Sequence, residues 1–238
     1  GQNLYLTIDE NVQEVVERYL GQAIEDYNVK GRACAIVMNV NTGAILAMAN
    51  MNQFDPNDPN TIYDSDLQAI LDSESLTEET TDTLVSYLGE TDRIQEIVAD
   101  GLIDDDEYSE VQGMLREAQW RNKAISDLYE PGSVFKLITA AAALDSGACK
   151  PTDYFVCAGK ISVAGTRFRC ANGHVHGAET FAQGLAVSCN PCFIQIGARL
   201  GKERFCDYFA AFGLREATGI DLPGEIKRSE YYTADRMG

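Results

Sequence analysis

Ser133 and Lys136 lie three residues apart, where a turn leads into a run of apolar residues. Pro131 and Gly132 favour the turn. Residues 134–144 predict a helix in which Lys136 is the one charged residue. Because residues three apart share one face of a helix, the hydroxyl and the amine should meet. Burial lowers the pKa of a lysine, so the amine could take the proton of a serine nucleophile.

A second interpretation gives Lys136 no chemistry. A lysine in a core helix can extend its ammonium group to solvent while its stem stays buried, and Ser-x-x-Lys spacing often arises by chance. For the catalytic interpretation, the serine lies at the start of an apolar helix, where free backbone N–H groups can stabilise an oxyanion. The tripeptide Asp145-Ser146-Gly147 predicts the end of this helix, with the glycine in the left-handed conformation.

Both histidines of the chain lie in one short segment that begins with a cysteine, Cys170 to His176. Cys157 lies upstream, in the other leg of a hairpin that we expect across residues 164–165. Thiolates and imidazoles are the ligands that zinc prefers in tetrahedral sites. Cys157, Cys170, His174 and His176 therefore form a candidate structural zinc site, whose four protein ligands leave no open position for water.

Two other interpretations of this segment stay open. Cys157 and Cys170 can form a disulfide across the hairpin, or the histidines are ordinary loop residues. Cys189 and Cys192 lie one turn apart near a second predicted helix, residues 181–200, and one of them can replace a ligand of the set. Such cysteines are more often small buried apolar residues. Seven cysteines in total fit a metal site or a cell living without oxygen better than a fully disulfide-bonded protein.

The composition sets outer limits on function. The 238 residues are 45% hydrophobic and 24% charged, which is typical of one soluble globular domain or one and a part. A net charge of −18 argues against nucleic acid and anionic membrane surfaces as partners. No apolar run approaches the length of a membrane span.

Apolar periodicity predicts the elements before the first motif. An amphipathic helix should run from about Asp9 to Tyr27. Two β-runs, residues 33–40 and 44–49, flank a turn at residues 41–43 and predict a hairpin. Because both runs are largely apolar, we expect both faces of the hairpin to be covered.

An acidic segment follows a loop at residues 54–60. Between Asp64 and Glu110 there are sixteen acidic residues and one basic residue, Arg93. We expect a solvated helical insertion at about residues 60–117, with a partner-binding role as the alternative. Residues 104–107 lack the ligand spacing of an EF-hand, so no calcium site is expected. Ser75 and Glu78 have the spacing of a capping box, which predicts a helix start. Two apolar stripes also indicate helices: the first consists of Ile94, Ile97 and Val98, and the second of Val111, Met114 and Leu115.

The sequence from Tyr129 to Lys136, Tyr-Glu-Pro-Gly-Ser-Val-Phe-Lys, resembles the first motif of the class B penicillin-binding proteins. These are the monofunctional peptidoglycan transpeptidases. The phrases at residues 6–13, 121–127 and 218–225 resemble the same family, so the resemblance covers nearly the whole chain. It implies an α+β fold, a penicillin-binding/serine β-lactamase-like domain in which helices flank an antiparallel sheet. The predicted hairpin would supply the first two strands, and the acidic segment would be an insertion.

The resemblance also supplies the second motif. Ser188 and Asn190 match the family's Ser-x-Asn, about fifty residues after Ser133. It implies that Ser133 is the nucleophile and Lys136 its base. Ser188 would relay a proton, and the Asn190 amide would hold the lysine and a substrate carbonyl. The alternative is that Ser188 or Asn190 is an ordinary helix cap.

The family's third motif, Lys-Thr-Gly or a close variant, does not occur in the sequence. The chain ends at residues 236–238, before the position where the resemblance would put this motif. We therefore expect residues 1–238 to be a partial transpeptidase domain that corresponds to its N-terminal portion and is incomplete at its C-terminal end.

The function that the resemblance implies is D,D-transpeptidation, in which stem peptides of peptidoglycan are cross-linked through an acyl-serine. β-Lactam antibiotics would acylate the same serine, and other cell-wall synthesis proteins would be further partners. No cofactor would serve catalysis. The enzyme would act at the extracytoplasmic face of the bacterial cell membrane, anchored by an N-terminal segment outside this chain. The alternatives are a serine β-lactamase, for which we identify no deacylating base, a β-lactam sensor, or an inert binding domain.

Overall fold

The computed structural model describes residues 3–29, 32–51, 54–73, 77–88, 92–99, 101, 104–226 and 233–237. The chain divides into two compact units, Gly1–Asp127 and Leu128–Gly238. The sequence predicted one partial domain with an insertion at about residues 60–117, and that boundary stays a prediction. Among the described residues, no helix combines the length and the apolar character that crossing a membrane requires.

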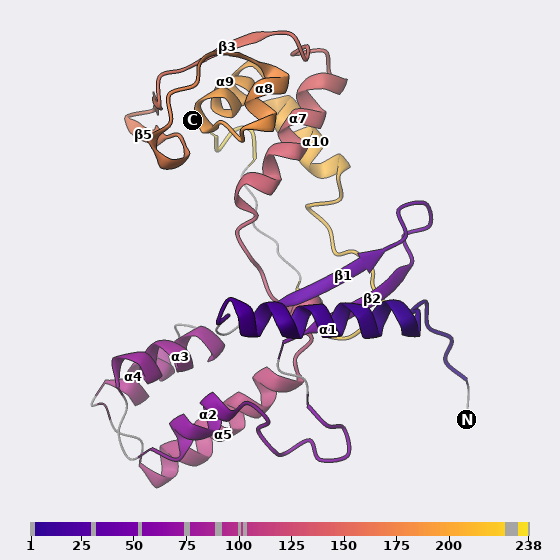
Figure 1. The fold of residues 1–238 in the computed structure, drawn as a ribbon, viewed down its shortest axis with the longest axis vertical. Coiled ribbons are helices and arrows are strands. Elements are labelled where there is room, and N and C mark those ends of the chain that lie inside the picture. Colours follow the sequence, from indigo (N-terminus) through magenta and orange to yellow (C-terminus); the bar gives the residue numbers. More distant parts are fainter. Residues whose placement is uncertain are drawn as a thin grey trace. The chain divides into compact units, whose positions relative to one another are not determined.

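In the first unit, a helix lies beside a hairpin, α1 (Glu10–Asp26) with β1 (Cys34–Met38) and β2 (Ile45–Asn50) (Figure 1). The predicted helix and hairpin are confirmed. Asp9 caps α1, because its carboxylate accepts hydrogen bonds from two backbone N–H groups of the first turn. Gln13 joins helix to strand: its Nε2 donates to the Met48 carbonyl at 3.0 Å, and its Oε1 accepts from the Met48 N–H at 2.8 Å.

The expectation that both faces of this hairpin are covered is wrong. Ala47 and Ala49 are buried, whereas Ile36 and Met38 are 46% and 53% exposed. Successive residues of a strand point to opposite faces, so the hairpin has one covered and one open face. An apolar run shows no alternation, and the sequence therefore could not tell which face would remain open.

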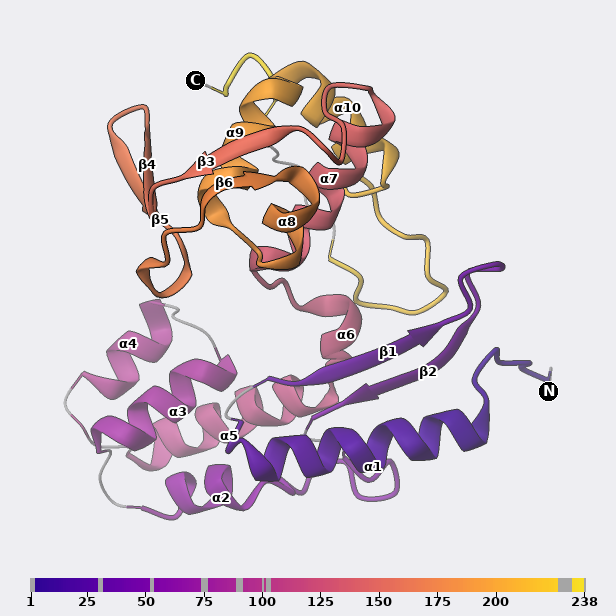
Figure 2. The same cartoon turned by 45° about the horizontal axis from the view of Figure 1, so that its top comes forward.

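The acidic segment forms helices that share a core of their own (Figure 2). Its helices are α2 (Ser65–Leu71), α3 (Glu78–Leu88), α4 (Asp92–Val98) and α5 (Asp105–Trp120). The predicted apolar stripes are confirmed, because they supply part of this core: Ile62, Leu67, Ile70, Leu71, Leu84, Tyr87, Ile94, Ile97, Val111 and Leu115. The segment is thus helical, as predicted, and it also has a hydrophobic interior.

The predicted capping box at Ser75 is not tested, because Ser75 lies outside the described residues. Near it, the side chain of Thr77 accepts a hydrogen bond from the Thr80 N–H at 3.2 Å. A capping box occurs at the start of α5, where Asp104 and Glu107 each accept a hydrogen bond from the other's backbone N–H. Two of the acidic residues 104–107, Asp104 and Glu107, therefore cap the N-terminus of α5.

The second unit carries both sequence motifs. A short helix, α6 (Lys123–Ser126), closes the first unit. The elements of the second are η1 (Gly132–Phe135), α7 (Lys136–Asp145), β3 (Tyr154–Cys157), β4 (Lys160–Val163), β5 (Thr166–Arg169), η2 (Ala171–Gly173), β6 (Gly177–Thr180), α8 (Phe181–Ala186), α9 (Asn190–Leu200) and α10 (Lys202–Ala211). Within the described residues the strands form three antiparallel pairs, β1–β2, β3–β6 and β4–β5. This combination of helices and antiparallel strands is the predicted α+β class.

Helices α7 and α9 pack together in the centre of this unit, and β3 and β6 lie beside α8 and α9 (Figure 2). The prediction that the helix after Ser133 is buried holds for one face only. Ala142 and Ala143 are buried, but Val134 and Leu137 are 64% and 58% exposed. Five of the seven cysteines lie in the core, which consists of Ala140, Ala143, Cys149, Phe155, Cys157, Cys170, Phe181, Cys189, Cys192, Phe193 and Ile196.

Candidate active site and cysteine cluster

The backbone turns sharply just before Ser133. Gly132 has a φ of +52°, in the left-handed region that glycine adopts without strain. Ser133 follows in η1 and is exposed, and Lys136 begins α7 one turn later. The turn therefore presents the hydroxyl to solvent while the lysine stem enters the fold.

The Lys136 ammonium group brings all four predicted catalytic residues together. Its Nζ lies 3.1 Å from Ser133 Oγ and 2.9 Å from Ser188 Oγ. It also donates to Asn190 Oδ1 and to the Ser188 carbonyl oxygen, both at 2.7 Å. On another side, the Phe193 ring centroid lies 5.8 Å from Nζ. The two motifs, far apart in sequence, thus form one hydrogen-bonded site.

The environment of Lys136 makes its amine easier to deprotonate than that of an exposed lysine. Burial lowers the pKa of this amine below its ordinary value, as the sequence predicted. A lysine with a lowered pKa is more often neutral near neutral pH, and a neutral amine can accept a proton. With Ser133 Oγ at 3.1 Å, the amine is placed to take the proton of the hydroxyl.

Ser188 and Asn190 lie at a break between two helices. The sequence predicted one helix over residues 181–200, but α8 ends at Ala186 and α9 begins at Asn190. Ser188 has a φ of +53°, a left-handed conformation that a right-handed helix cannot continue. This break turns the Ser188 side chain toward Lys136, where a continuous helix would not place it. Such a conformation is strained for a residue other than glycine and is typical of functional sites.

Asn190 is fixed from two directions. Its Nδ2 donates to the Arg169 carbonyl at the end of β5, at 3.0 Å, while its Oδ1 accepts from Lys136. Sequence reasoning did not anticipate the contact with Arg169, because no motif marks a backbone carbonyl. The hairpin β4–β5 therefore takes part in positioning the second motif.

The structure brings three of the four predicted zinc ligands together, and Cys189 takes the place of the fourth, His174. The ligand atoms of Cys157, Cys170, His176 and Cys189 all lie within 4.8 Å of one another. We call these four residues the cysteine cluster. His174 is exposed and does not belong to it; only its carbonyl oxygen is near, at 3.7 Å from Cys157 Sγ.

Within the cysteine cluster, Cys170 Sγ lies 3.9 Å from Cys189 Sγ and 3.8 Å from His176 Nδ1. All seven cysteines lie in the described part of the chain and are free thiols, so the structure contains no Cys157–Cys170 disulfide. Burial alone would raise the pKa of Cys157, but hydrogen bonds from the backbone of His176 and Gly159 lower it to about 7. Burial, with a contribution from Glu179, raises the pKa of Cys189.

The predicted hairpin across residues 164–165 explains how distant cysteines meet. Ala164 and Gly165 both have positive φ, as a two-residue hairpin turn requires, and β5 returns antiparallel to β4. At the base of the hairpin, the Cys170 N–H donates to the Gly159 carbonyl at 2.9 Å. Cys157 lies just before β4 and Cys170 just after β5, so the hairpin brings both cysteines to its base, where they join the core.

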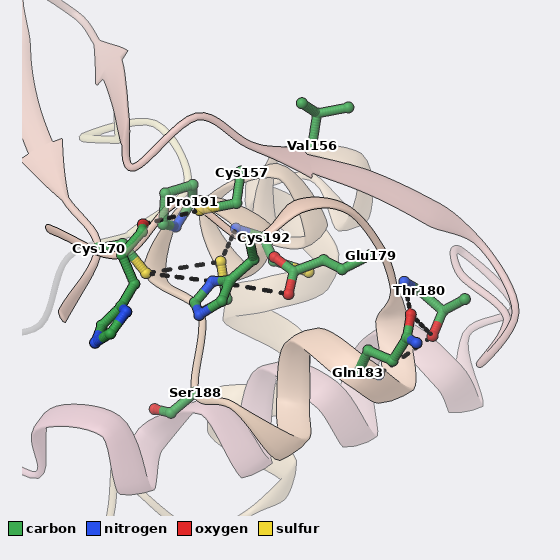
Figure 3. A network of polar contacts seen from close by, with 12 residues as sticks. Val156, Cys157, Cys170, Glu179, Thr180, Gln183, Ser188, Pro191 and Cys192 are labelled. Atoms are coloured by element: carbon green, nitrogen blue, oxygen red, sulfur yellow. Dashed lines mark hydrogen bonds and ion pairs between the residues drawn. The ribbon is translucent and has the colours of Figure 1, made fainter.

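Glu179 is a residue that the sequence analysis missed. It lies in β6, its side chain is 5% exposed, and its Oε2 is 3.9 Å from His176 Nδ1. The other oxygen, Oε1, is buried without a hydrogen-bond partner. Figure 3 shows the Glu179 carboxylate and the Cys170 side chain directed toward the same space, while Ser188 points away from it. In the sequence, the one signal for a role of Glu179 was its position three residues after His176.

The comparisons with known proteins agree on one family. A family model described as the penicillin binding protein transpeptidase domain matches residues 33–231. Stage V sporulation protein D of Bacillus subtilis is 33% identical over 226 residues, which are 94% of this chain and 27% of that protein. Peptidoglycan D,D-transpeptidase FtsI of Escherichia coli is 25% identical over 229 residues, 94% of this chain and 28% of that protein.

A solved structure shows the same fold. Penicillin-binding protein 3 from Mycobacterium tuberculosis, complexed with aztreonam, aligns with a TM-score of 0.63 and 26% identity. The alignment covers 93% of this chain and 38% of that chain. This chain spans about a quarter of the length of the Bacillus subtilis and Escherichia coli relatives. It belongs to the penicillin-binding protein transpeptidase family and, within that family, to the class B proteins.

Proposed function

We propose that the chain carries the acylation centre of a peptidoglycan D,D-transpeptidase. The observation that supports this most directly is the set of hydrogen bonds at Lys136 Nζ, which joins Ser133, Ser188 and Asn190. The relatives include proteins named as peptidoglycan D,D-transpeptidases. Since the chain spans about a quarter of the length of such a relative, the activity of the whole protein is part of the proposal.

In the acylation step, Ser133 Oγ attacks the carbonyl carbon of a D-Ala-D-Ala bond while Lys136 takes the hydroxyl proton. The peptide C–N bond then breaks, and the departing D-Ala amine needs one proton. Ser188 Oγ, at 2.9 Å from Lys136 Nζ, can pass that proton from the lysine to the leaving nitrogen. An amine from a neighbouring strand then attacks the acyl-serine, which restores Ser133 and completes the cross-link.

The substrates follow from this chemistry. Stem peptides of peptidoglycan are the acyl donors and acceptors, and β-lactams acylate Ser133 in their place. The relative from Mycobacterium tuberculosis was solved with aztreonam, a β-lactam, which supports the second part. Peptidoglycan lies outside the cytoplasm, so we place the enzyme at the extracytoplasmic face of the membrane. Partners among other cell-wall synthesis proteins stay a prediction from the sequence.

The test is the intact mass after incubation with benzylpenicillin, on this chain and on any longer natural form that contains it. We expect a stable adduct of one penicillin per chain, absent from Ser133→Ala. Rapid hydrolysis of penicillin without accumulation would instead indicate a β-lactamase. A folded longer form that stays unmodified would contradict the role of Ser133 and leave a binding domain as the explanation.

A further inference from the structure

Two separations within the cysteine cluster match those of a tetrahedral metal site. Four ligands at zinc–sulfur and zinc–nitrogen distances of about 2.3 and 2.1 Å place two sulfurs about 3.8 Å apart, and sulfur and nitrogen about 3.6 Å apart. The measured separations are 3.9 Å for Cys170 Sγ to Cys189 Sγ and 3.8 Å for Cys170 Sγ to His176 Nδ1. A disulfide needs sulfurs about 2.0 Å apart, so the separation of Cys170 Sγ and Cys189 Sγ suits two metal ligands and is too long for a disulfide.

Glu179 is an independent sign of an ion at this place. A carboxylate 5% exposed, with one oxygen lacking a hydrogen-bond partner, is costly to bury unless a neighbouring positive group compensates it. Its other oxygen lies 3.9 Å from His176 Nδ1, the same ring nitrogen that lies 3.8 Å from Cys170 Sγ. The Glu179 carboxylate therefore borders the space between the ligand atoms, where a cation would offset its charge.

The surroundings of Cys189 also suit a metal-bound thiolate. The Cys192 N–H donates to Cys189 Sγ at 3.4 Å, and Cys189 caps the start of α9. Backbone N–H groups at a helix start stabilise negative charge on a sulfur. Cys189 is fully buried, as is Cys157 at the end of β3.

We propose that Cys157, Cys170, His176 and Cys189 bind one Zn²⁺ ion in a closed tetrahedral site, beside the buried carboxylate of Glu179. With four protein ligands, the ion has no open position and takes no part in bond making. Soft thiolate ligands in a tetrahedral set select zinc over magnesium or calcium. The site differs from the sequence-derived set, because Cys189 takes the place of His174.

The position of Cys189 gives the ion a second effect. This residue lies between Ser188 and Asn190, and both of them contact Lys136. Ser188 is held at a φ of +53°, a strained conformation that persists only where surrounding contacts enforce it. The bond from zinc to Cys189 would supply that restraint. Loss of zinc would then release the second motif from Lys136, a consequence that rests on the proposed function.

The first test measures zinc alone, by mass spectrometry of the metal in the purified chain and by release to a chelating dye. We expect one Zn²⁺ per chain, and cobalt substitution should give the intense d–d and thiolate charge-transfer bands of a tetrahedral thiolate site. The full set of free thiols should be titratable after zinc is removed. A folded chain that neither contains nor takes up zinc, or one that holds a cysteine disulfide instead, would overturn the proposal.

Matched variants separate the ligands from their neighbours. Cys189→Ala should lose zinc, whereas His174→Ala and Cys149→Ala, another buried cysteine of the same core, should retain it. Glu179→Gln should bind zinc about tenfold more weakly in chelator competition, because it keeps an acceptor but loses the charge. Retention of zinc by Cys189→Ala together with its loss in His174→Ala would show that the exchange of ligands is wrong.

A ligand variant could lose zinc simply because it does not fold. The wild type, from which zinc is removed by mild chelation, avoids this ambiguity. Removal of zinc should lower the melting temperature, and added Zn²⁺ should restore it. Penicillin acylation should fall and recover in parallel, while Ser133→Ala should retain its zinc throughout. Zinc binding without acylation in any form would refute the proposed function and leave the metal site standing. Acylation that is unchanged by zinc removal would refute the coupling.

Discussion

At Lys136, one ammonium group has four acceptors within hydrogen-bonding distance and only three protons. A neutral amine fits the same geometry differently. It can donate to the Ser188 carbonyl and to Asn190 Oδ1, both at 2.7 Å, and accept from the Ser133 hydroxyl at 3.1 Å. The site thus accommodates the lysine before and after proton transfer, as a general base requires.

The rate of penicillin acylation should rise with pH through the pKa of Lys136 and then level off. Only the neutral amine can take the Ser133 proton, and burial moves its pKa below the ordinary lysine value, so the rise should centre below that value. The second-order rate constant, measured across pH in the wild type, checks this. The groups that face the amine are Ser133, Ser188, Asn190 and Phe193, with Cys170, Cys189 and Cys192 nearby.

The control for this pH profile is Lys136→Ala. It should acylate about 10²- to 10⁴-fold more slowly, which is the usual contribution of a general base. What remains of the rate should lack the rise with pH. A wild-type rate that is independent of pH, or a variant that keeps the rise, would assign the base to another group.

At the scale of elements, helix caps and turn residues in the sequence correctly predicted those elements whose ends depend on neighbouring residues. The bounds of α1 and the hairpin β4–β5 follow from an Asp9 cap and from turn residues, and both were predictable. The break before α9 was not, because Ser188 adopts a left-handed conformation that no periodicity indicates. Nor could spacing choose Cys189 over His174. Which of the two reaches the cluster depends on how β6 and α9 pack.

The contact between α8 and α9 depends on a glycine. A Cβ on Gly184 would lie 2.3 Å from Cys192 Sγ and 3.0 Å from Cys192 Cβ. Gly184→Ala should therefore destabilise the fold by about 1 to 3 kcal/mol through overpacking, measured by urea unfolding. It should also slow acylation, since α9 carries Asn190.

Gly197→Ala is the matched control for this change. It lies in α9 with open space around its Cβ position, so the substitution should stabilise the helix by about 0.5 to 1 kcal/mol. Equal effects of the two substitutions on unfolding would mean that Gly184 makes no close contact, and the packing of α8 on α9 would have to be revised.

At the scale of the whole molecule, the described residues form two hydrophobic cores, one in each compact unit. The candidate active site and the cysteine cluster lie in the second unit, whereas 26 of the 37 acidic residues belong to the first. The net charge of −18 resides largely in the acidic segment, whose helices share the core of the first unit.

Ile97→Ala tests whether the two cores are energetically separate. Ile97 is buried in the core of the first unit, so truncation should lower its stability by about 2 to 5 kcal/mol. We expect the early part of a thermal unfolding curve to shift while the zinc content of the folded protein stays at the wild-type value. A proportional loss of zinc would show that the two units unfold as one cooperative body.

The distance along the chain between the two motifs has a consequence for synthesis. Ser133 and Lys136 emerge more than fifty residues before Ser188 and Asn190, which supply most of the hydrogen-bond acceptors of the lysine. A nascent chain that has reached residue 140 therefore has a nucleophile without the groups that orient its base. In the proposed function, the serine would become reactive only after α9 has docked against α7, and the folding of the second motif would then time the appearance of activity.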